Sequence, residues 1–300
     1  MSAPVVVGVD GSASSLSAVE LAAREARLRG RGLKVVHAFI WPMMHVPQGT
    51  SALGPSSLGP PGGGLRNIMG RMVAEAVQRA RSVEPDVEVT NAVVTGEPLM
   101  VLEAQSRNAA LIVVGSRGLG GFVGLLLGST AVHLAAHSHC PVLVAREQSV
   151  PGGRILLGVD GSPAGDAAVD FAFEEASLRG SSLVALHAWT TWNAPLPAPQ
   201  DDAEPYANQS GELACAEERL VSETLAGHRE RYPGVTVEHR VTRGRTREAL
   251  IEESRAARML VVGARGRGGF VGLLLGSVSQ AMLHHAHCPV AVVRGPTEPR

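Results

Sequence analysis

Short runs of hydrophobic residues alternate along the chain with longer segments that have the period of an amphipathic helix. In the first half, four apolar runs and one alternating stretch predict strands, at 5–9, 33–39, 87–94, 111–114 and 142–144. Between them, helical periodicity predicts helices at 16–29, 66–82, 98–107 and from Ser129 onward. Ser12 is a helix N-cap candidate and Gly30 a stop. Apolar strands that alternate with helices indicate an α/β fold with a parallel sheet covered on both faces.

The same order of elements occurs twice. The sequence GVDGS at 8–12 returns at 158–162, and the segment 113–129 matches 261–277 at 15 of 17 positions. A repeat of this length is too long for a solenoid unit and has the size of a domain. We therefore expect two similar domains, residues 1–148 and 154–296, joined at a turn-rich segment. Each is expected to be a five-stranded parallel sheet with helices on both faces, a Rossmann-like fold.

A glycine-rich segment follows the fourth predicted strand of each repeat. Its spacing is Gly-x2-Gly-x9-Gly-Ser, from Gly115 to Ser129 and from Gly263 to Ser277. Glycine permits positive φ, so we expect the first two glycines to turn backbone N–H groups inward as an anion nest. The third precedes a helix whose unpaired N–H groups and dipole attract phosphate. These donors suit a polyphosphate; the alternative is that the glycines serve only a tight turn.

An aspartate ends the first predicted strand of each repeat. Asp10 and Asp160 can accept hydrogen bonds from ribose hydroxyls or coordinate a Mg²⁺ ion carried by the phosphates. The alternative is a turn residue in Asp-Gly-Ser. Gly8, two residues earlier on the same strand face, is expected to leave space beside the carboxylate.

Arginines lie inside both glycine-rich segments. Arg117 and Arg265 are candidate phosphate contacts, and the alternative is that they are only solvated. Arg267 replaces Leu119 within the second glycine-rich segment, so the second site is expected to carry more positive charge.

Composition and the absence of other known motifs exclude several classes of binding site and partner. Lys34 is the only lysine and lies outside any glycine-rich segment, so the Walker A motif is absent, as is the Rossmann glycine fingerprint. A net charge of −1 argues against nucleic-acid or anionic membrane partners. The N-terminus lacks signal-peptide features and the apolar runs are shorter than a membrane span, so we expect a soluble, cytoplasmic protein. The histidines near 133–139 and 284–287 lack the ligand spacing of a zinc site.

The glycine spacing, the two aspartates and the two repeats, which span nearly the whole chain, resemble a tandem universal stress protein of the ATP-binding subgroup. The resemblance implies that backbone at Ala38 and Ala188, each 28 residues after its aspartate, meets the adenine edge. It also implies a five-stranded sheet of the adenine nucleotide alpha hydrolase-like type, pairing of the outer fifth strands between domains, and a homodimer of tandem chains. The residues expected to bind the nucleotide are Gly8, Asp10, Ala38, Gly115, Arg117, Gly118, Gly128, Ser129 and Thr130 in the first repeat, and Gly158, Asp160, Ala188, Gly263, Arg265, Gly266, Arg267, Gly276, Ser277 and Val278 in the second.

The resemblance also implies a role. It suggests a regulator of stress response, dormancy or growth, in which bound ATP and its Mg²⁺ set the conformation presented to an unknown protein partner. The alternative is a slow ATPase or a phosphoryl or nucleotidyl transferase, which needs a base, a nucleophile or a charge clamp. Neither glycine-rich segment contains Lys, Glu or His, which favours binding over turnover. A third possibility is a structural dimer whose glycine-rich segments bind nothing. The segments 41–65 and 190–211 differ between repeats and are expected to be lids or partner surfaces; the alternative is a disordered connection.

Overall fold

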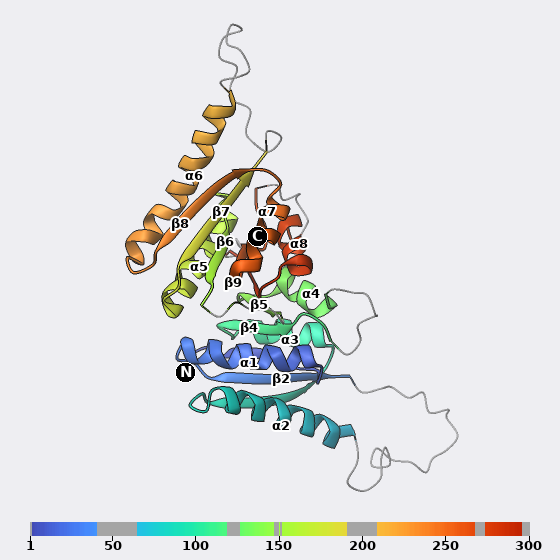
Figure 1. Cartoon of the computed structure of the whole chain (residues 1–300). Helices are drawn as coiled ribbons and strands as arrows, with labels where there is room; N and C mark the ends of the chain where they lie inside the picture. Colours follow the sequence, from blue (N-terminus) through green and yellow to red (C-terminus); the bar gives the residue numbers. More distant parts are fainter. Residues whose placement is uncertain are drawn as a thin grey trace, which may run out of the picture. The chain divides into compact units, whose positions relative to one another are not determined.

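The structure, a computed structural model of the 300-residue chain, describes residues 2–40, 65–118, 127–146, 150, 152–190, 209–267 and 274–295. Contacts divide the chain into two compact units: Met1–Leu134 with Ser138–Cys140, and Ala135–His137 with Pro141–Arg300. Figure 1 shows strands and helices alternating through both units. Most of the two segments expected to be lids, 41–64 and 191–208, lies outside the described residues.

The elements of the first unit follow the order predicted from the hydrophobic pattern. They are β1 Val5–Gly8, α1 Ala13–Leu28, β2 Leu33–Phe39, α2 Leu65–Val83, β3 Val89–Thr95, α3 Pro98–Ser106, β4 Leu111–Gly115 and α4 Ser129–His137, whose last turn belongs to the second unit. The N-cap prediction is confirmed, because the Ser12 hydroxyl accepts a hydrogen bond from the backbone N–H of Ser15 at 3.1 Å. Gly30 has φ of +58° just beyond α1, as a helix stop requires.

The strand order of the first unit creates a switch point. The strands lie in the order β3-β2-β1-β4, all parallel, with Val5 of β1 paired to Leu33 on one side and Leu111 on the other. Crossover connections are right-handed, so α1 and α2, which lead outward from β1, cover one face. The connection from β3 back to β4 runs in the opposite direction and places α3 on the other face. Ligands of such sheets bind at the carboxyl ends of the two strands where the direction reverses, here β1 and β4.

The second unit repeats this arrangement and adds a strand from the first repeat. Its elements are β5 Val142–Ala145, β6 Arg154–Gly158, η1 Pro163–Gly165, α5 Asp166–Arg179, β7 Leu183–Trp189, α6 Gln209–Arg231, β8 Val237–Arg243, α7 Thr246–Glu253, η2 Ser254–Ala256, β9 Ala257–Gly263, α8 Ser277–His285 and β10 Val290–Val293. The strand order is β5-β10-β9-β6-β7-β8, so its switch point lies between β6 and β9.

The sheet of the second unit is mostly, not wholly, parallel. β10 pairs with β9 in parallel and with β5 antiparallel, Val290 lying opposite Val144. This is the pairing of fifth strands that the family resemblance implied. All four residues of β5 and of β10 are buried, so the pairing also buries apolar surface.

The helix that follows the first strand of each repeat carries a buried ion pair. Oε2 of Glu25 in α1 lies 3.2 Å from Nη1 of Arg29, the C-cap of that helix, with 1% and 5% of the two side chains exposed. Glu175 and Arg179 of α5 form the matching pair. Such pairs offset the cost of burying each charge alone. Within the described ranges, no helix combines the length and the hydrophobicity that crossing a membrane requires.

Candidate functional site

A cleft opens at the switch point of the first unit. It encloses about 550 Å³ of space between atoms, a figure that includes open solvent at its mouth. Its lining comes from the carboxyl ends of β1, β2 and β4 and from the first turns of α1, α3 and α4. The lining residues are Gly8, Val9, Asp10, Ser15, Val36, Ala38, Pro98, Leu102, Val114, Gly115, Arg117, Gly118, Gly128, Thr130 and Ala131. Eight of the nine residues predicted for the first repeat therefore lie around one cavity.

Asp10 uses its two carboxylate oxygens differently. Oδ1 accepts hydrogen bonds from the backbone N–H of Ser12 at 3.0 Å and from its hydroxyl at 2.6 Å. This is the turn role that the sequence analysis held as the alternative. Oδ2 faces the glycine-rich segment, where a Cβ atom on Gly118 would lie 2.5 Å from it. Asp10 thus both shapes the turn and brings a carboxylate into the cleft.

The reason for glycine at 115 and 118 is space and not backbone conformation. Among the described glycines, positive φ occurs at Gly11 and five others, and neither Gly115 nor Gly118 is one of them, so that expectation was wrong. A Cβ on Gly115 would lie 2.6 Å from the Ser14 hydroxyl and 2.8 Å from its carbonyl carbon. The end of β4 therefore passes too close to α1 and to Asp10 to carry a side chain. The residues 119–126 that continue the segment lie outside the described part.

The start of the glycine-rich segment is tied to the first turn of α1. The Ser14 hydroxyl accepts a hydrogen bond from the backbone N–H of Arg117 at 3.3 Å, and the Ser12 hydroxyl lies 3.4 Å from the Arg117 carbonyl oxygen. Ser15, a buried lining residue, approaches the backbone N–H of Asp10 at 3.5 Å. Sequence reasoning treated this serine cluster only as a helix cap, although three serines within four positions beside an Asp-Gly turn were a visible signal.

The first turn of α4 closes the other side of the cleft. Gly128 is its N-cap and provides no side-chain hydrogen bond, so the first N–H groups of the helix are not capped by it. Thr130 lines the cavity, whereas Ser129 is exposed and does not. A Cβ on Gly128 would have no atom nearer than 3.7 Å, so space alone does not demand glycine there. The arrangement presents backbone donors and a positive helix end to the cleft.

Charge in the first cleft is sparse. Among its lining residues, only Asp10 and the exposed Arg117 are ionisable, and the rest are apolar, hydroxyl or glycine. Leu102 of α3, which sequence reasoning missed, fills the space beside Gly8, where a Cβ would lie 2.8 Å from its Cδ1 atom. The space expected beside the carboxylate is therefore partly occupied by α3. An apolar wall with few polar groups is suited to a flat, largely uncharged ring.

The second unit builds the same frame from the second repeat. Oδ1 of Asp160 accepts from the backbone N–H and the hydroxyl of Ser162 at 3.0 and 2.7 Å, and Oδ2 accepts from the backbone N–H of Arg267 at 2.8 Å. A Cβ on Gly266 would overlap Oδ2, which repeats the relation of Gly118 to Asp10. A Cβ on Gly158 would lie 3.2 Å from Leu250, as Gly8 meets Leu102.

The remaining predicted residues of the second repeat occupy corresponding positions. Ala188 is near the end of β7 and its carbonyl accepts from the Thr246 hydroxyl at 3.1 Å. Gly276 caps α8 without a side-chain hydrogen bond, and Ser277 and Val278 begin that helix. Gly263 ends β9, and Arg265, two residues beyond it, is exposed.

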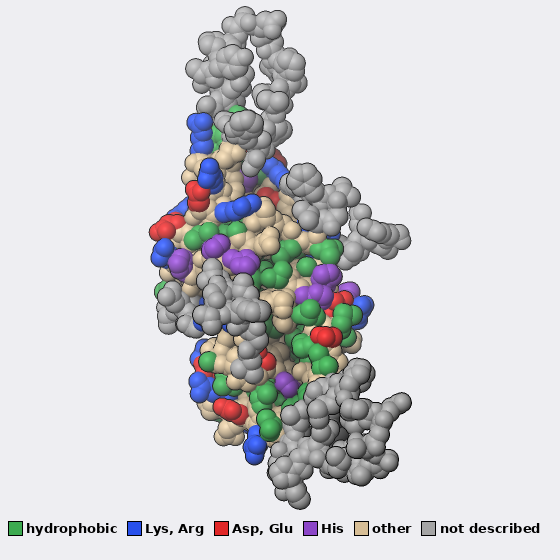
Figure 2. Space-filling model, turned by 90° about the vertical axis from the view of Figure 1, so that its right-hand side faces the viewer, with side chains coloured by type: hydrophobic (Ala, Val, Ile, Leu, Met, Phe, Trp, Pro, Cys, Tyr) green, Lys and Arg blue, Asp and Glu red, His purple; other side chains and the backbone are tan. Residues whose placement is uncertain are grey.

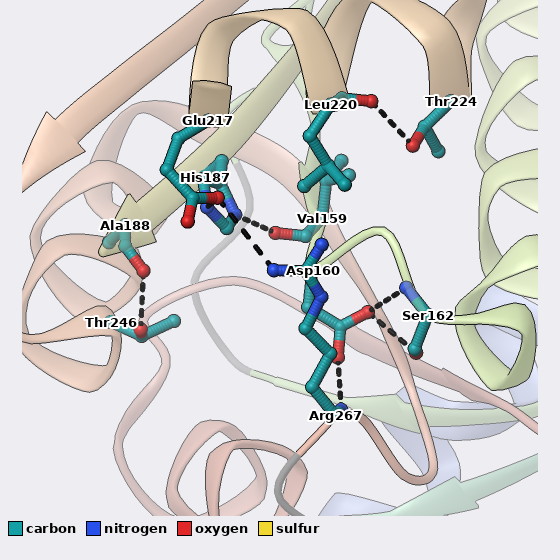
Figure 3. A network of polar contacts seen from close by, with 10 residues as sticks. All are labelled: Val159, Asp160, Ser162, His187, Ala188, Glu217, Leu220, Thr224, Thr246 and Arg267. Carbon is teal, nitrogen blue, oxygen red and sulfur yellow. Dashed lines mark hydrogen bonds and ion pairs between the residues drawn. The ribbon is translucent and has the colours of Figure 1, made fainter. Parts of the chain in front are cut away.

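A polar network in the second unit joins the end of β6 to β7, α6 and the exposed Arg267 of the glycine-rich segment (Figure 3). His187 of β7 bonds the Val159 carbonyl through Nδ1 at 2.7 Å and Glu217 of α6 through Nε2 at 2.8 Å. The same Glu217 oxygen lies 3.7 Å from the Arg267 guanidinium. In the first unit His37 likewise bonds the Val9 carbonyl at 2.8 Å. Sequence reasoning did not single out Glu217, because one glutamate in a helix rich in glutamate gives no signal.

Metal ligands do not gather elsewhere in the described residues. Figure 2 shows several histidine side chains on one face of the molecule. Within the described ranges, no group of three or more His, Cys, Asp or Glu residues is placed to hold a metal ion. A cation that binds with a phosphate ligand needs fewer protein groups, and Asp10 and Asp160 each place one carboxylate at their site.

Comparison with known proteins gives one consistent result. The model of the universal stress protein family matches residues 1–146 and 153–294. A universal stress protein of Mycobacterium tuberculosis is 36% identical over 98% of this chain and 96% of its own length. One of Mycolicibacterium smegmatis is 36% identical over 97% and 96%. The crystal structure of a universal stress protein from Archaeoglobus fulgidus covers 98% of this chain and 99% of its own, with a TM-score of 0.67 and 20% identity, which supports the fold alone.

Proposed function

The chain belongs to the universal stress protein family, and from the geometry of its first cleft we propose that it binds an adenine nucleotide, ATP with Mg²⁺, and acts as a nucleotide-dependent regulator. The observation that carries the proposal is the position of Asp10. One of its carboxylate oxygens is fixed by Ser12, and the other faces Gly118 at the mouth of a cleft on the switch point. A carboxylate fixed in this way is suited to ribose hydroxyls.

Three parts of the cleft would hold three parts of the ligand. The apolar wall formed by Val36, Ala38 and Leu102 suits the adenine ring, and the backbone at Ala38 is suited to its polar edge. Backbone donors from the first turn of α4 and from the segment that begins at Gly115 suit the phosphates, with the Arg117 guanidinium as a cation nearby. Asp10 would hold the ribose hydroxyls or, as the alternative, a Mg²⁺ ion carried by the phosphates, which would supply positive charge to offset that of the ligand.

The sparse charge of the cleft favours a binding role over an enzymatic one. Hydrolysis of ATP needs a group that orients or deprotonates water and cations that stabilise the transferring phosphoryl group. Of the residues that line the first cleft, only Asp10 and Arg117 are ionisable. We therefore expect occupancy, rather than turnover, to be the signal that a protein partner reads. We further propose that the protein acts in the cytoplasm as a homodimer of tandem chains, with domains at 1–148 and 154–296.

Binding to the purified full-length chain tests the proposal. Titration with Mg-ATP by calorimetry should give saturable binding, and Asp10→Ala should weaken it about 10–100-fold at the first site, because a charge-assisted hydrogen bond contributes about 1.5–3 kcal/mol. Asp86→Ala is the matched control, since Asp86 is an exposed aspartate remote from the cleft lining. A wild-type chain that gives no heat with Mg-ATP, or an Asp10→Ala chain with unchanged affinity, would refute the proposal. A phosphate-release assay on the same samples separates binding from slow hydrolysis.

A further inference from the structure

The turn that follows the first strand differs between the two units. In the first unit α1 begins at Ala13, directly after its N-cap Ser12. In the second unit a short 3₁₀ turn, Pro163–Gly165, precedes α5 and provides no side-chain hydrogen bond to cap that helix. The second repeat has Pro-Ala-Gly where the first has Ala-Ser-Ser. Two hydroxyl groups are therefore missing from the second turn, and a glycine stands where the first helix continues.

This difference changes how the glycine-rich segment contacts the turn. In the first unit a Cβ on Gly115 would lie 2.6 Å from the Ser14 hydroxyl oxygen, which also accepts a hydrogen bond from the backbone N–H of Arg117 at 3.3 Å. The Ser116 hydroxyl lies 3.5 Å from the same oxygen. In the second unit the nearest atom of the 3₁₀ turn would be 3.5 Å from a Cβ on Gly263. The second segment is therefore less closely packed against the turn before its first helix.

The second segment is held instead by the helix that follows it, α8. The hydroxyl of Ser279, a buried residue, donates to the carbonyl oxygens of Gly263 and Ala264 at 2.9 and 3.0 Å. At the repeat offset of 148 residues, Ser279 corresponds to Ala131, whose methyl group cannot form these bonds. Each segment thus has a serine anchor, which comes from α1 in the first unit and from α8 in the second.

We propose that Ser14 is a positioning residue for the phosphates in the first site, where it provides the anchoring that Ser279 provides in the second unit. This inference rests on the proposed nucleotide binding. Ser14 is not part of the cleft lining; it holds the backbone of Arg117, which is. Ser12, which fixes Asp10, lies in the same turn. The groups proposed for the ribose and for the phosphates are therefore held together by the start of α1.

Moving the anchor from one helix to the other tests this in the full-length chain. The parent is Gly266→Val, in which the second site is closed because a Cβ there would overlap the carboxylate of that site. In this parent, Ser14→Ala should weaken Mg-ATP binding about three- to tenfold by calorimetry, the loss of one neutral hydrogen bond. Adding Ala131→Ser, which copies Ser279, should recover most of the lost affinity. Ser17→Ala, at an exposed serine of the same helix, is the matched control for helix propensity and should leave the affinity unchanged.

Amide hydrogen exchange gives a second readout that needs no ligand. In Ser14→Ala the backbone N–H of Arg117 loses its hydroxyl acceptor, so it should exchange faster than in the parent. Unchanged exchange at Arg117, unchanged Mg-ATP affinity in Ser14→Ala, a loss that Ala131→Ser does not reverse, or an equal loss in Ser17→Ala would each overturn the anchoring role. If instead the wild-type chain binds no Mg-ATP, the proposed function is wrong, and the exchange at Arg117 still reports whether Ser14 holds the segment.

Discussion

Replacing Gly118 with alanine tests the closest steric relation in the first site. A Cβ atom at this position would lie 2.5 Å from Oδ2 of Asp10, whereas real Cβ contacts essentially never fall below 3.0 Å. The segment or the carboxylate must therefore move by at least the 0.5 Å between these two values. If the carboxylate moves, it loses its bonds of 3.0 and 2.6 Å to Ser12; if the segment moves, its donors leave the phosphate position.

Either movement is expected to remove about one charge-assisted hydrogen bond to the proposed nucleotide. Such a bond is worth about 1.5–3 kcal/mol, so affinity for Mg-ATP should fall about 10–100-fold. Gly266→Val serves to close the second site, because a Cβ at that position would overlap Oδ2 of Asp160. Calorimetric titration of the Gly266→Val/Gly118→Ala chain with Mg-ATP, compared with Gly266→Val alone, therefore measures the loss of affinity at the first site. Gly128→Ala in the same background is the control, because its Cβ has no neighbour within 3.7 Å and should change affinity only a few-fold. Equal losses for Gly118→Ala and Gly128→Ala would refute the steric reasoning.

Two further predictions concern stability and thiol chemistry. Glu25→Ala should lower the free energy of unfolding by about 3–5 kcal/mol in urea denaturation, because it leaves Arg29 buried without its acidic partner. The double change of Glu25 and Arg29 to leucine should lower it much less. A loss below about 1 kcal/mol for the single change would contradict a stabilising role of the buried pair. Burial raises the pKa of Cys140 to about 11 and that of Cys288 to about 12, whereas Cys215 is exposed. At pH 8 a thiol reagent should therefore label Cys215 quickly, and Cys140 and Cys288 only after denaturation. Rapid labelling of all three cysteines in the native protein would contradict the protection of Cys140 and Cys288.

The hydrophobic pattern predicted the order of strands and helices, because the buried faces of these elements determine where apolar residues occur in the sequence. β2 occupies Leu33–Phe39 as predicted, and the ends of α1 differ from the prediction by no more than three residues. The repeat was decisive: one α/β pattern seen twice left a single consistent element order. The pairing of β5 with β10 is different, since two short apolar strands carry no signal of their partner, and only the family resemblance implied it.

The candidate site was predicted as a set of positions but not as a mechanism of packing. The pattern of Gly115 and Gly118 correctly marked a place where the chain needs glycine, yet the reason is the approach of Ser14 and Asp10 and not positive φ. A sequence records that a side chain is missing, and does not record which neighbour excludes it. The place of Leu102 in the cleft was missed for the same reason. An apolar residue on a helix is ordinarily interpreted as part of the core, and the sequence does not show that Leu102 packs against Gly8 at the end of β1.

Near-identity of the glycine-rich segments is weak evidence that the two sites bind alike. Those segments supply the backbone frame, which must be the same wherever a strand end passes an aspartate this closely. The side chains behind the frame come from α2 and α6, where the repeats have diverged. At the repeat offset of 148 residues, the neutral Met69 of α2 corresponds to Glu217 of α6. One of the two differences within the 17-residue segment is that Arg267 stands where the first repeat has Leu119. Its guanidinium lies 3.7 Å from the carboxylate of Glu217 on α6. We therefore expect the two proposed nucleotide sites to differ in affinity, and a titration of the wild-type chain with Mg-ATP that shows two phases would support this, whereas a single phase with two equal sites would contradict it.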